Sequence, residues 1–132
     1  MHIPAALAGR FYLIVEDEYL AASSMMAALE DAGAQVAGPV STIAGALELV
    51  SKRKQELDGA ILDINLRGEM AYPVAETLLE REIPFVFVTG YDCHSMPSPF
   101  QIMPCLNKPC DEQELLMVLA DLPARQHPGL SG

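Results

Sequence analysis

The fold is decided by the apolar run Phe11-Tyr12-Leu13-Ile14-Val15, which ends at the three acids Glu16-Asp17-Glu18. Five consecutive apolar residues are typical of a strand that is buried on both faces, as in a parallel sheet. The stretch from Tyr19 to Leu29 holds no charged residue and is rich in Ala, Leu and Met, so it predicts a helix. Strand, acidic turn and helix together indicate one unit of an α/β fold.

The same unit recurs along the chain. Short apolar runs predict four further strands, at Gln35–Val40, Gly59–Ile64, Pro84–Val88 and Met103–Leu106. Helical patterns and caps predict helices that start at Ser41 or Thr42, at Pro73 and at Asp111, with a polar loop at Arg67–Ala71. The prolines between Tyr91 and Ile102 predict that the fourth helix is short or distorted. We therefore expect a doubly wound five-stranded parallel sheet, flavodoxin-like in order 2-1-3-4-5, with helices on both faces.

Length and charge restrict the function classes. The 132 residues fit one domain, which we place at residues 1–122, followed by a loose tail at 123–132. A formal charge of −10 argues against binding to nucleic acid or to an anionic membrane. No apolar run approaches the roughly 20 residues that span a bilayer, and Met1 to Arg10 does not resemble a secretory signal. With no room for a DNA-binding domain, we expect the chain to act through protein contacts.

The three cysteines, Cys93, Cys105 and Cys110, are odd in number and form no Cys-x-x-Cys motif. We therefore expect reduced thiols in a cytoplasmic protein. A zinc site built from these cysteines and His94 is an alternative, although the spacing matches no common zinc finger.

Charged and polar side chains follow four of the five predicted strands. Glu16 and Asp17 end the first strand, Asp63 lies near the end of the third, Thr89 ends the fourth and Lys108 follows the fifth. Because the carboxyl ends of parallel strands meet at one edge of a sheet, these side chains are expected to converge. Carboxylates 4 Å apart in a partly screened site repel by on the order of 4 kcal/mol per pair, so the site needs a cation. Oxygen ligands favour Mg²⁺.

Such a site can accept a phosphoryl group. Asp63 can attack phosphorus and hold the group as an aspartyl phosphate. Lys108 and Mg²⁺ would offset charge on the transferred oxygens, and the Thr89 hydroxyl can donate a hydrogen bond to one of them. The sequence therefore predicts a phosphoacceptor site.

Four segments together resemble the successive signatures of response-regulator receiver domains, the CheY-like domains of two-component signalling. The segments are Leu13–Glu18, Ile61–Leu66, Val88–Gly90 and Lys108-Pro109, within a likeness that covers roughly positions 10 to 122. The resemblance implies a phosphorelay shuttle, a phosphate sink or a kinase regulator, rather than an enzyme acting on a separate substrate.

The resemblance also assigns roles to individual residues. It implies that Asp63 is the phosphoacceptor, that Asp17 binds Mg²⁺ directly and that Glu16 binds it mostly through water. It implies a metal contact from the backbone carbonyl of Asn65, and phosphate contacts from Thr89 and the lysine that follows the last strand. That lysine is implied to precede its proline through a cis peptide bond.

The stretch from Pro84 to Tyr91 is similar to the stand-alone receivers named FATGUY after their Phe-Ala-Thr-Gly signature, with Val88 in place of the alanine. This likeness implies a sensor histidine kinase of the HWE/HisKA2 type as partner, with a histidine phosphotransfer protein as the alternative. Most receivers carry Tyr or Phe three residues before the lysine, where this chain has Cys105. FATGUY-like receivers also lack that ring. We therefore expect order in residues 91–103 to be the readout, in place of ring rotation.

The uncharged first helix cannot bury every side. We expect Tyr19, Ala22 and Met26 to leave an apolar patch exposed, and receivers that resemble this chain use their first helix to meet kinase helices. A homodimer contact or plain surface is the alternative interpretation, so we expect a monomer or a weak homodimer.

Three other functions are weighed against a phosphoacceptor. A pseudo-receiver that never carries phosphate would bind proteins only, and the complete set of site residues argues against it. A flavin-binding domain would need a loop rich in hydroxyls and amides after the first strand, where this chain has three acids. A phosphatase that works through an aspartyl intermediate would show a second Asp two positions after Asp63, where this chain has Asn65.

Overall fold

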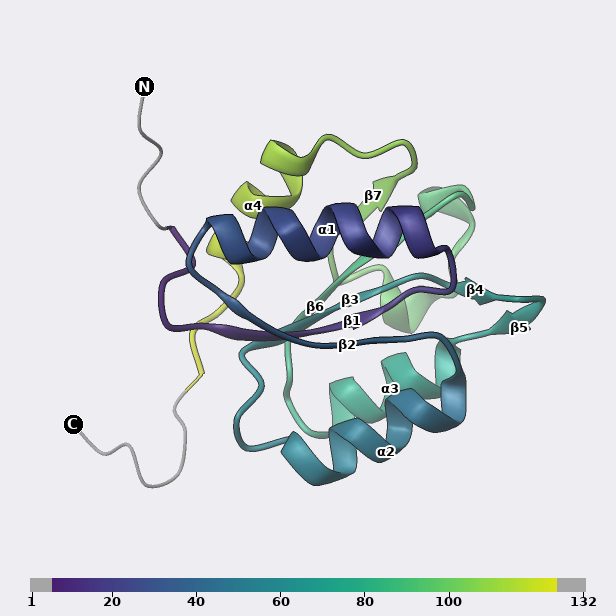
Figure 1. Cartoon of the computed structure of the whole chain (residues 1–132). Helices are drawn as coiled ribbons and strands as arrows, with labels where there is room; N and C mark the ends of the chain where they lie inside the picture. The colour runs from purple at the N-terminus through teal and green to yellow at the C-terminus, as the bar shows by residue number, and fades with distance from the viewer. Residues whose placement is uncertain (1–5, 126–132) are drawn as a thin grey trace.

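The computed structural model describes residues 6–125 (Figure 1). Its central sheet is parallel and has the strand order β2-β1-β3-β6-β7. The strands are β1 at Phe11–Val15, β2 at Gln35–Val40, β3 at Gly59–Leu62, β6 at Phe85–Thr89 and β7 at Cys105–Asn107. These are the five predicted strands in chain order, so the expected order 2-1-3-4-5 is confirmed.

Helices cover both faces of the sheet. In Figure 1, α1 (Tyr19–Asp31) and α4 (Glu112–Asp121) lie on one side, and α2 (Ile43–Arg53) and α3 (Tyr72–Glu80) lie on the other. This arrangement confirms the doubly wound fold, with every strand–helix unit except the fourth carrying an α-helix.

Each central strand contributes to two cores because successive side chains point to opposite faces. Leu13 and Leu62 pack in the core beneath α2 and α3, whereas Ile14 and Ile61 pack in the core beneath α1 and α4. Burial on both faces is the reason why these strands are continuous apolar runs in the sequence.

The helix starts follow the predicted caps. The Thr42 hydroxyl accepts a hydrogen bond from the backbone N–H of Gly45 at 3.0 Å, and Asp111 accepts one from Gln113 at 3.0 Å. Pro73 lies in the first turn of α3, where its missing N–H removes no intrahelical bond. Local sequence chemistry therefore sets where these helices begin.

One predicted loop contains structure of its own. Residues 65–70 form a small antiparallel hairpin of β4 (Asn65–Leu66) and β5 (Glu69–Met70), so the predicted polar loop at 67–71 is wrong where it covers β5. Its two-residue turn has φ values of 54° at Arg67 and 89° at Gly68. Positive φ at both central positions is typical of a hairpin turn.

The connection from β6 to β7 holds two short 3-10 turns, η1 at Cys93–Ser95 and η2 at Ser98–Phe100, in place of a full helix. The predicted distortion of this unit is confirmed. The second half of the connection is held by the buried Phe100 ring, which stacks on Tyr72 at 5.1 Å and meets Phe87 edge-on at 6.2 Å.

The predicted tail at 123–132 lies mostly outside the described residues, so the domain boundary at 122 stays a prediction. In the described part of this segment, Arg125 donates hydrogen bonds to the backbone carbonyls of Lys54 and Leu57. Among residues 6–125, no helix is long and apolar enough to cross a membrane.

Candidate functional site

Three carboxylates meet at the carboxyl edge of the sheet, as the strand ends predicted. Oxygen atoms of Glu16, Asp17 and Asp63 all lie within 4.8 Å of one another. Glu16 and Asp63 are buried, and their backbone N–H groups donate to Val40 and Val15 at 2.9 and 3.0 Å. The sheet ladder therefore fixes both acids beside the loop that carries Asp17.

Lys108 lies among these acids. Its ammonium nitrogen is 2.8 Å from Glu16 Oε1, 3.1 Å from Asp63 Oδ2 and 3.2 Å from Glu18 Oε1. The backbone N–H of Lys108 donates to the carbonyl of Thr89 at 2.8 Å, and the bond from Lys108 to Pro109 is cis, as predicted. The end of β6 and the turn after β7 thus hold the lysine over the carboxylates.

The surroundings of the site shift the pKa values of Glu16 and Lys108. Burial raises the pKa of Glu16 to about 7, and Asp63 adds to this effect, although hydrogen bonds from Lys108 and Glu18 oppose it. Burial lowers the pKa of Lys108, but its bond to Glu16 and the charges of Asp63 and Glu16 outweigh burial, so that pKa is raised. The lysine is therefore held as an ammonium, whereas the buried acid resists ionisation.

The hairpin β4–β5 positions the outer part of the site. Asp17 Oδ2 accepts a hydrogen bond from the backbone N–H of Arg67 at 3.0 Å. The backbone N–H of Asn65 donates to Asp63 Oδ1 at 3.3 Å, and the Asn65 side chain accepts from Gly68 at 2.7 Å. The structure thus places Asn65 beside Asp63, while the proposed metal contact of its backbone carbonyl stays a prediction.

An open cavity of about 410 Å³ lies above the acids, and Asp17, Asp63, Thr89 and Lys108 all line it. The Thr89 side chain is buried, and its hydroxyl accepts a hydrogen bond from the backbone N–H of Tyr91 at 3.1 Å. At Gly90 no heavy atom lies within 4 Å of the position that a Cβ would take. No side chain at position 90 therefore narrows the cavity beside Thr89.

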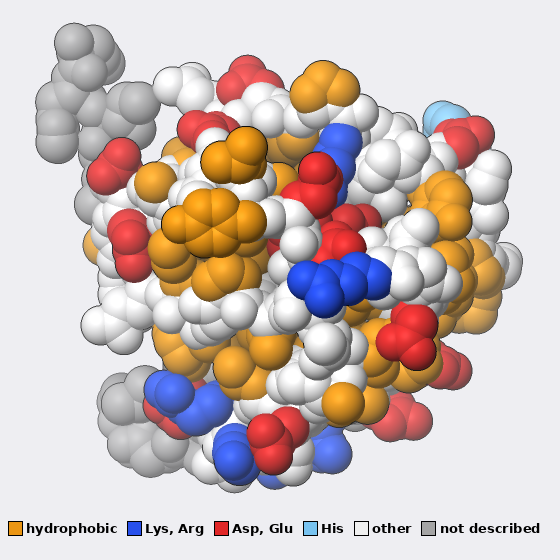
Figure 2. All heavy atoms as spheres, turned by 45° about the vertical axis from the view of Figure 1, so that its right-hand side comes forward, with side chains coloured by type: hydrophobic (Ala, Val, Ile, Leu, Met, Phe, Trp, Pro, Cys, Tyr) orange, Lys and Arg blue, Asp and Glu red, His pale blue; other side chains and the backbone are white. Residues whose placement is uncertain are grey.

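The donor set fits a hard divalent cation. Glu16 Oε1 is buried and has no hydrogen-bond partner among the described residues, although it lies in ion-pair contact with Lys108. In Figure 2, acidic side chains gather in the middle of the face that shows the carboxyl edge of the sheet, with basic side chains directly beside them. Glu16, Asp17 and Asp63 thus bring three carboxylates together against the single ammonium of Lys108, and such a cluster of oxygen ligands suits Mg²⁺.

Two residues contribute to the site without having been assigned a role from the sequence. Glu18 belongs to the acidic run after β1, but its ion pair with Lys108 depends on how the turn before α1 folds. Asn107 donates from its side chain to the backbone carbonyls of Thr89 and Tyr91, the first at 3.3 Å. In the sequence, only the position of Asn107 directly before Lys108 could have indicated that it belongs to the site.

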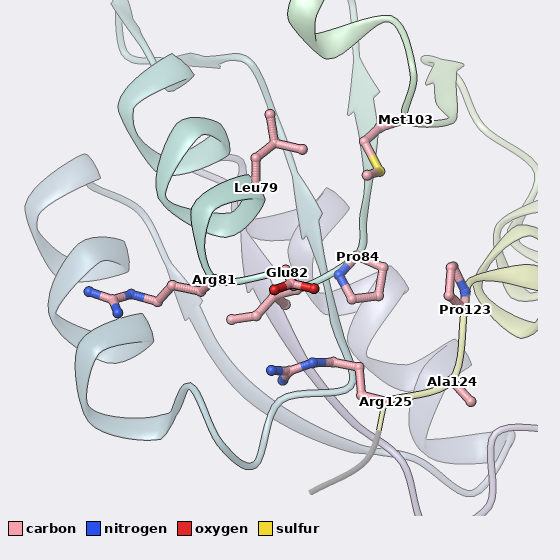
Figure 3. Close-up of a pocket in the computed structure, with 9 residues that line it drawn as sticks. Leu79, Arg81, Glu82, Pro84, Met103, Pro123, Ala124 and Arg125 are labelled. Atoms are coloured by element: carbon pink, nitrogen blue, oxygen red, sulfur yellow. The ribbon is translucent and has the colours of Figure 1, made fainter.

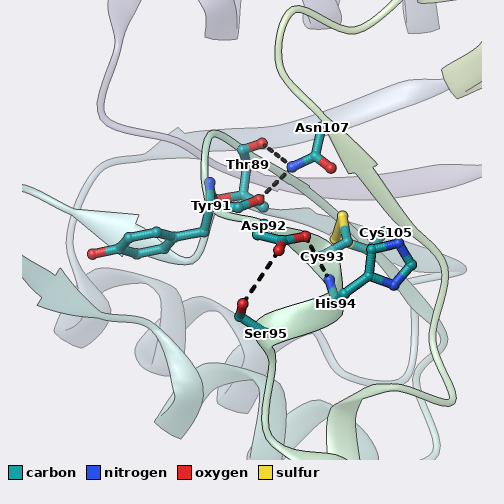
Figure 4. The surroundings of a disulfide bond; sticks show 8 residues. All are labelled: Thr89, Tyr91, Asp92, Cys93, His94, Ser95, Cys105 and Asn107. Carbon is teal, nitrogen blue, oxygen red and sulfur yellow. Dashed lines mark hydrogen bonds between the residues drawn. A yellow bond between two sulfur atoms is a disulfide. The ribbon is translucent and has the colours of Figure 1, made fainter.

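The cysteines differ from the prediction. Cys93 and Cys105 form a disulfide, so the expectation of three reduced thiols is wrong for this pair (Figure 4). The connection after β6 returns beside β7 and brings the two Cα atoms to 5.8 Å, a proximity that sequence spacing does not reveal. Cys110 is free and packs beneath α1 and α4, so the four residues of the alternative zinc site do not assemble.

The apolar patch on α1 also differs in part. Tyr19 is 80% exposed, as expected, whereas Ala22 is only 2% exposed and Met26 is partly buried. The expectation that Ala22 is exposed is therefore wrong, because this residue lies on the same helix face as the buried Met25 and Leu29. Leu20, 81% exposed, takes its place in the patch.

A second cavity, of about 620 Å³, lies at the opposite end of the sheet, where β6 begins (Figure 3). Pro84, Met103 and Pro123 line it together with the charged side chains of Glu82 and Arg125. It contains none of the residues that converge at the carboxyl edge. The smaller cavity above Asp63 is therefore the candidate functional site.

Fold and site together define the class of receiver-type signalling modules, and comparison with known proteins agrees. Residues 12–120 match the family described as the response regulator receiver domain. The solution structure of SdrG from Sphingomonas melonis Fr1 is 42% identical with a TM-score of 0.72, and the match covers 87% of this chain and 95% of that chain. The chain belongs to the response regulator receiver domain family.

Other solved structures show the same likeness. The BeF3-activated conformation of SdrG from Pseudomonas melonis Fr1 is 43% identical, with a TM-score of 0.70 over 86% of this chain and 98% of that chain. A CheY-like receiver domain from Methylobacillus flagellatus is 28% identical, with a TM-score of 0.70 over 83% of this chain and 95% of that chain. Among proteins with curated descriptions, none matches significantly.

Proposed function

We propose that this receiver accepts a phosphoryl group from a histidine kinase onto Asp63 and signals through protein contacts. One observation carries the proposal. Asp63 opens into a cavity at the carboxyl edge while its Oδ2 lies 3.1 Å from the ammonium of Lys108 and close to the oxygens of Glu16 and Asp17. A carboxylate held in this way is a nucleophile with positive charge at hand for the transferred oxygens.

The proposed reaction is a single displacement at phosphorus. A carboxylate oxygen of Asp63 forms a bond to phosphorus, the bond from phosphorus to the donor histidine nitrogen breaks, and the nitrogen keeps the electron pair. Lys108 is held as an ammonium and would bind a phosphoryl oxygen. The Thr89 hydroxyl, which lines the same cavity, would donate a hydrogen bond to another. For this the hydroxyl proton must be directed into the cavity while its oxygen accepts from Tyr91.

We further propose that Glu16, Asp17 and Asp63, with the Asn65 backbone carbonyl, hold Mg²⁺. When bound, Mg²⁺ neutralises charge on the carboxylates and on the transferred phosphoryl oxygens. The chain's own part is to keep Asp17 aimed at the site through the Arg67 amide and to keep Glu16 buried beside Asp63, with Lys108 as their shared cation.

For the partner we propose a sensor histidine kinase of the HWE/HisKA2 type, with docking on α1. The similarity of residues 84–91 to FATGUY receivers supports this kinase type, and the match to SdrG, which covers 95% of that chain, supports a stand-alone receiver. The exposed Tyr19 directly follows Glu18, which lines the cavity, and the partly buried Met26 adds apolar surface further along the same helix. We also propose that the protein acts in the cytoplasm, as a monomer or a weak homodimer.

The proposal is tested with acetyl phosphate and Mg²⁺, followed by intact-mass measurement. Wild-type protein is expected to gain one phosphoryl group that hydroxylamine removes, and Asp63→Asn is expected to gain none. Asp111→Asn is a matched control, because asparagine caps α4 as well as aspartate does, and it should behave like wild type. Wild-type protein that never gains phosphate would instead support the pseudo-receiver, and phosphate on Asp63→Asn would place the acceptor elsewhere.

A further inference from the structure

We propose that Cys93 and Cys105 are a reversible thiol–disulfide pair whose oxidation restrains the connection between β6 and β7 beside the phosphoacceptor site. The consequence for signalling rests on the proposed function, whereas the restraint itself does not.

The two sulfur atoms join a fixed element to a weakly held one. Cys105 lies in β7 and pairs with Phe87 in the parallel ladder, so its backbone is fixed by the sheet. Cys93 begins η1, where Asp92 accepts hydrogen bonds from the amide of His94 at 2.9 Å and the hydroxyl of Ser95 at 3.3 Å. Those bonds stay inside the turn and do not attach it to the sheet. The disulfide therefore supplies the covalent attachment of η1 to β7 (Figure 4).

The attachment is close to the residue proposed to bind phosphate. Only three residues separate Thr89 from Cys93, and the first two of them, Gly90 and Tyr91, line the phosphoacceptor cavity. The side chain of Asn107 bonds to the carbonyls of Thr89 and Tyr91, which ties the same short stretch to β7 from the other side. A displacement of Thr89 or Tyr91 must therefore move η1, and a disulfide at Cys93 opposes that movement.

The pair can be reached by small redox reagents. Cys93 and Cys105 are half-buried, and both line a cavity of about 290 Å³ that His94, Met96, Gln101 and Met103 complete. Oxidation by a peroxide balances as two thiols and hydrogen peroxide giving one disulfide and two waters. Reduction by a dithiol returns both thiols and leaves the reductant as a disulfide. Disulfides in a reducing compartment are usually transient or redox-sensing, which fits a pair in a cytoplasmic receiver.

The third cysteine provides a matched control. Cys110 is partly buried and packs against the core beneath α1 and α4, and its only described polar contact is a long thiol bond to the Asp111 carbonyl at 3.4 Å. It lies outside the connection between β6 and β7. A Cys110→Ser variant therefore removes a thiol without touching the proposed pair.

The first measurement counts thiols and follows amide exchange in the whole chain. After peroxide, alkylation should label Cys110 alone, and after dithiothreitol it should label all three cysteines. Amides of residues 91–95 are expected to exchange at least about tenfold faster in the reduced form. Cys93→Ser and Cys105→Ser should exchange like reduced protein under both treatments, whereas Cys110→Ser should follow wild type.

The second measurement adds beryllofluoride with Mg²⁺ as a phosphate mimic. In reduced protein the mimic is expected to change exchange across residues 91–103 at least about threefold more than in oxidised protein. Equal exchange in the two redox states, or alkylation of Cys93 and Cys105 after peroxide, would overturn the inference. An exchange difference that persists while neither form takes phosphate on Asp63 would instead contradict the proposed function.

Discussion

Lys108 Nζ lies 2.8 Å from Glu16 Oε1, at the inner end of the site. The same ammonium also forms ion pairs with Asp63 and Glu18. A single positive charge cannot neutralise several carboxylates, so negative charge remains in excess beside a buried oxygen. Burial raises the pKa of Glu16 to about 7, and the negative charge of Asp63 adds to the rise. The site is therefore electrostatically unfavourable by itself, and a bound cation would relieve it.

The first prediction concerns pH. Because the pKa of Glu16 is raised from 4.5 to about 7 on folding, its contribution to stability is present below pH 4.5 and is lost as the pH rises through 7. Metal-free protein should lose up to about 3 kcal/mol of unfolding free energy over this range, and Mg²⁺ should restore part of it at pH 8. Lys108 is charged throughout this pH range in both the folded and the unfolded protein, so it does not contribute to the pH dependence of stability. Urea unfolding in EDTA and in Mg²⁺ measures the effect.

Glu16→Gln is the matched variant for this measurement. Glutamine cannot ionise, so the fall in stability between pH 4.5 and 7 should flatten, and metal-free Glu16→Gln should be more stable than wild type at pH 8. Profiles that run parallel for the two proteins would mean that some group other than Glu16 causes the fall.

The second prediction concerns Lys108 itself. Lys108→Ala leaves the buried Glu16 and Asp63 without their cation, which should cost on the order of 3 kcal/mol in metal-free protein. It should also slow phosphorylation by acetyl phosphate at saturating Mg²⁺. Lys52→Ala is the control, because Lys52 is 3.8 Å from Glu48 with both side chains about 70% exposed, and a surface pair contributes at most about 1 kcal/mol. Comparable losses in the two variants would contradict a special role for Lys108.

The sheet and the inner site could be predicted because both depend on short, continuous signals. Strands buried on both faces need apolar residues at every position, so Phe11–Val15 and Gly59–Leu62 were visible as runs. Because the carboxyl ends of parallel strands meet at one edge of the sheet, Asp63, Thr89 and Lys108 could be predicted to lie together from their positions at the strand ends. In a parallel sheet, residues that end successive strands lie close together in space, and this rule was sufficient to predict the inner site.

Other features depend on tertiary packing. The stretch of α1 from Tyr19 to Leu29 offers no charged face to fix its rotation, so the sequence could not decide between Ala22 and Leu20 as the exposed residue. The disulfide between Cys93 and Cys105 requires η1 to fold back on β7, a contact with no local signature. The hairpin at 65–70 turns through Arg67, and arginine is not a residue that favours positive φ.

The third prediction concerns the second half of the β6–β7 connection. Phe100 is buried between Tyr72 and Phe87, so Phe100→Ala should lower the unfolding free energy by about 3–5 kcal/mol. The neighbouring Ile102 is 73% exposed, and Ile102→Ala should change stability by no more than about 0.5 kcal/mol. Urea unfolding decides this, and a small effect at Phe100 would show that the connection is not anchored by its ring.

The fourth prediction tests docking on α1. Tyr19 and Leu20 are 80% and 81% exposed, so changing both to glutamate should leave stability within about 1 kcal/mol of wild type. If α1 receives the kinase, phosphotransfer from the cognate kinase should fall at least about tenfold, because two charges would face an apolar surface. Phosphorylation by acetyl phosphate should be unchanged, since neither residue lines the cavity above Asp63.

Met26 is a poorer choice of residue for this test because it is partly buried against the α1–α4 core, so a charge there would disturb packing as well. Ile102→Glu, an exposed apolar residue on a different element, should transfer phosphate like wild type. Equal losses with kinase and acetyl phosphate would remove α1 as the docking surface and indicate damage to the site itself.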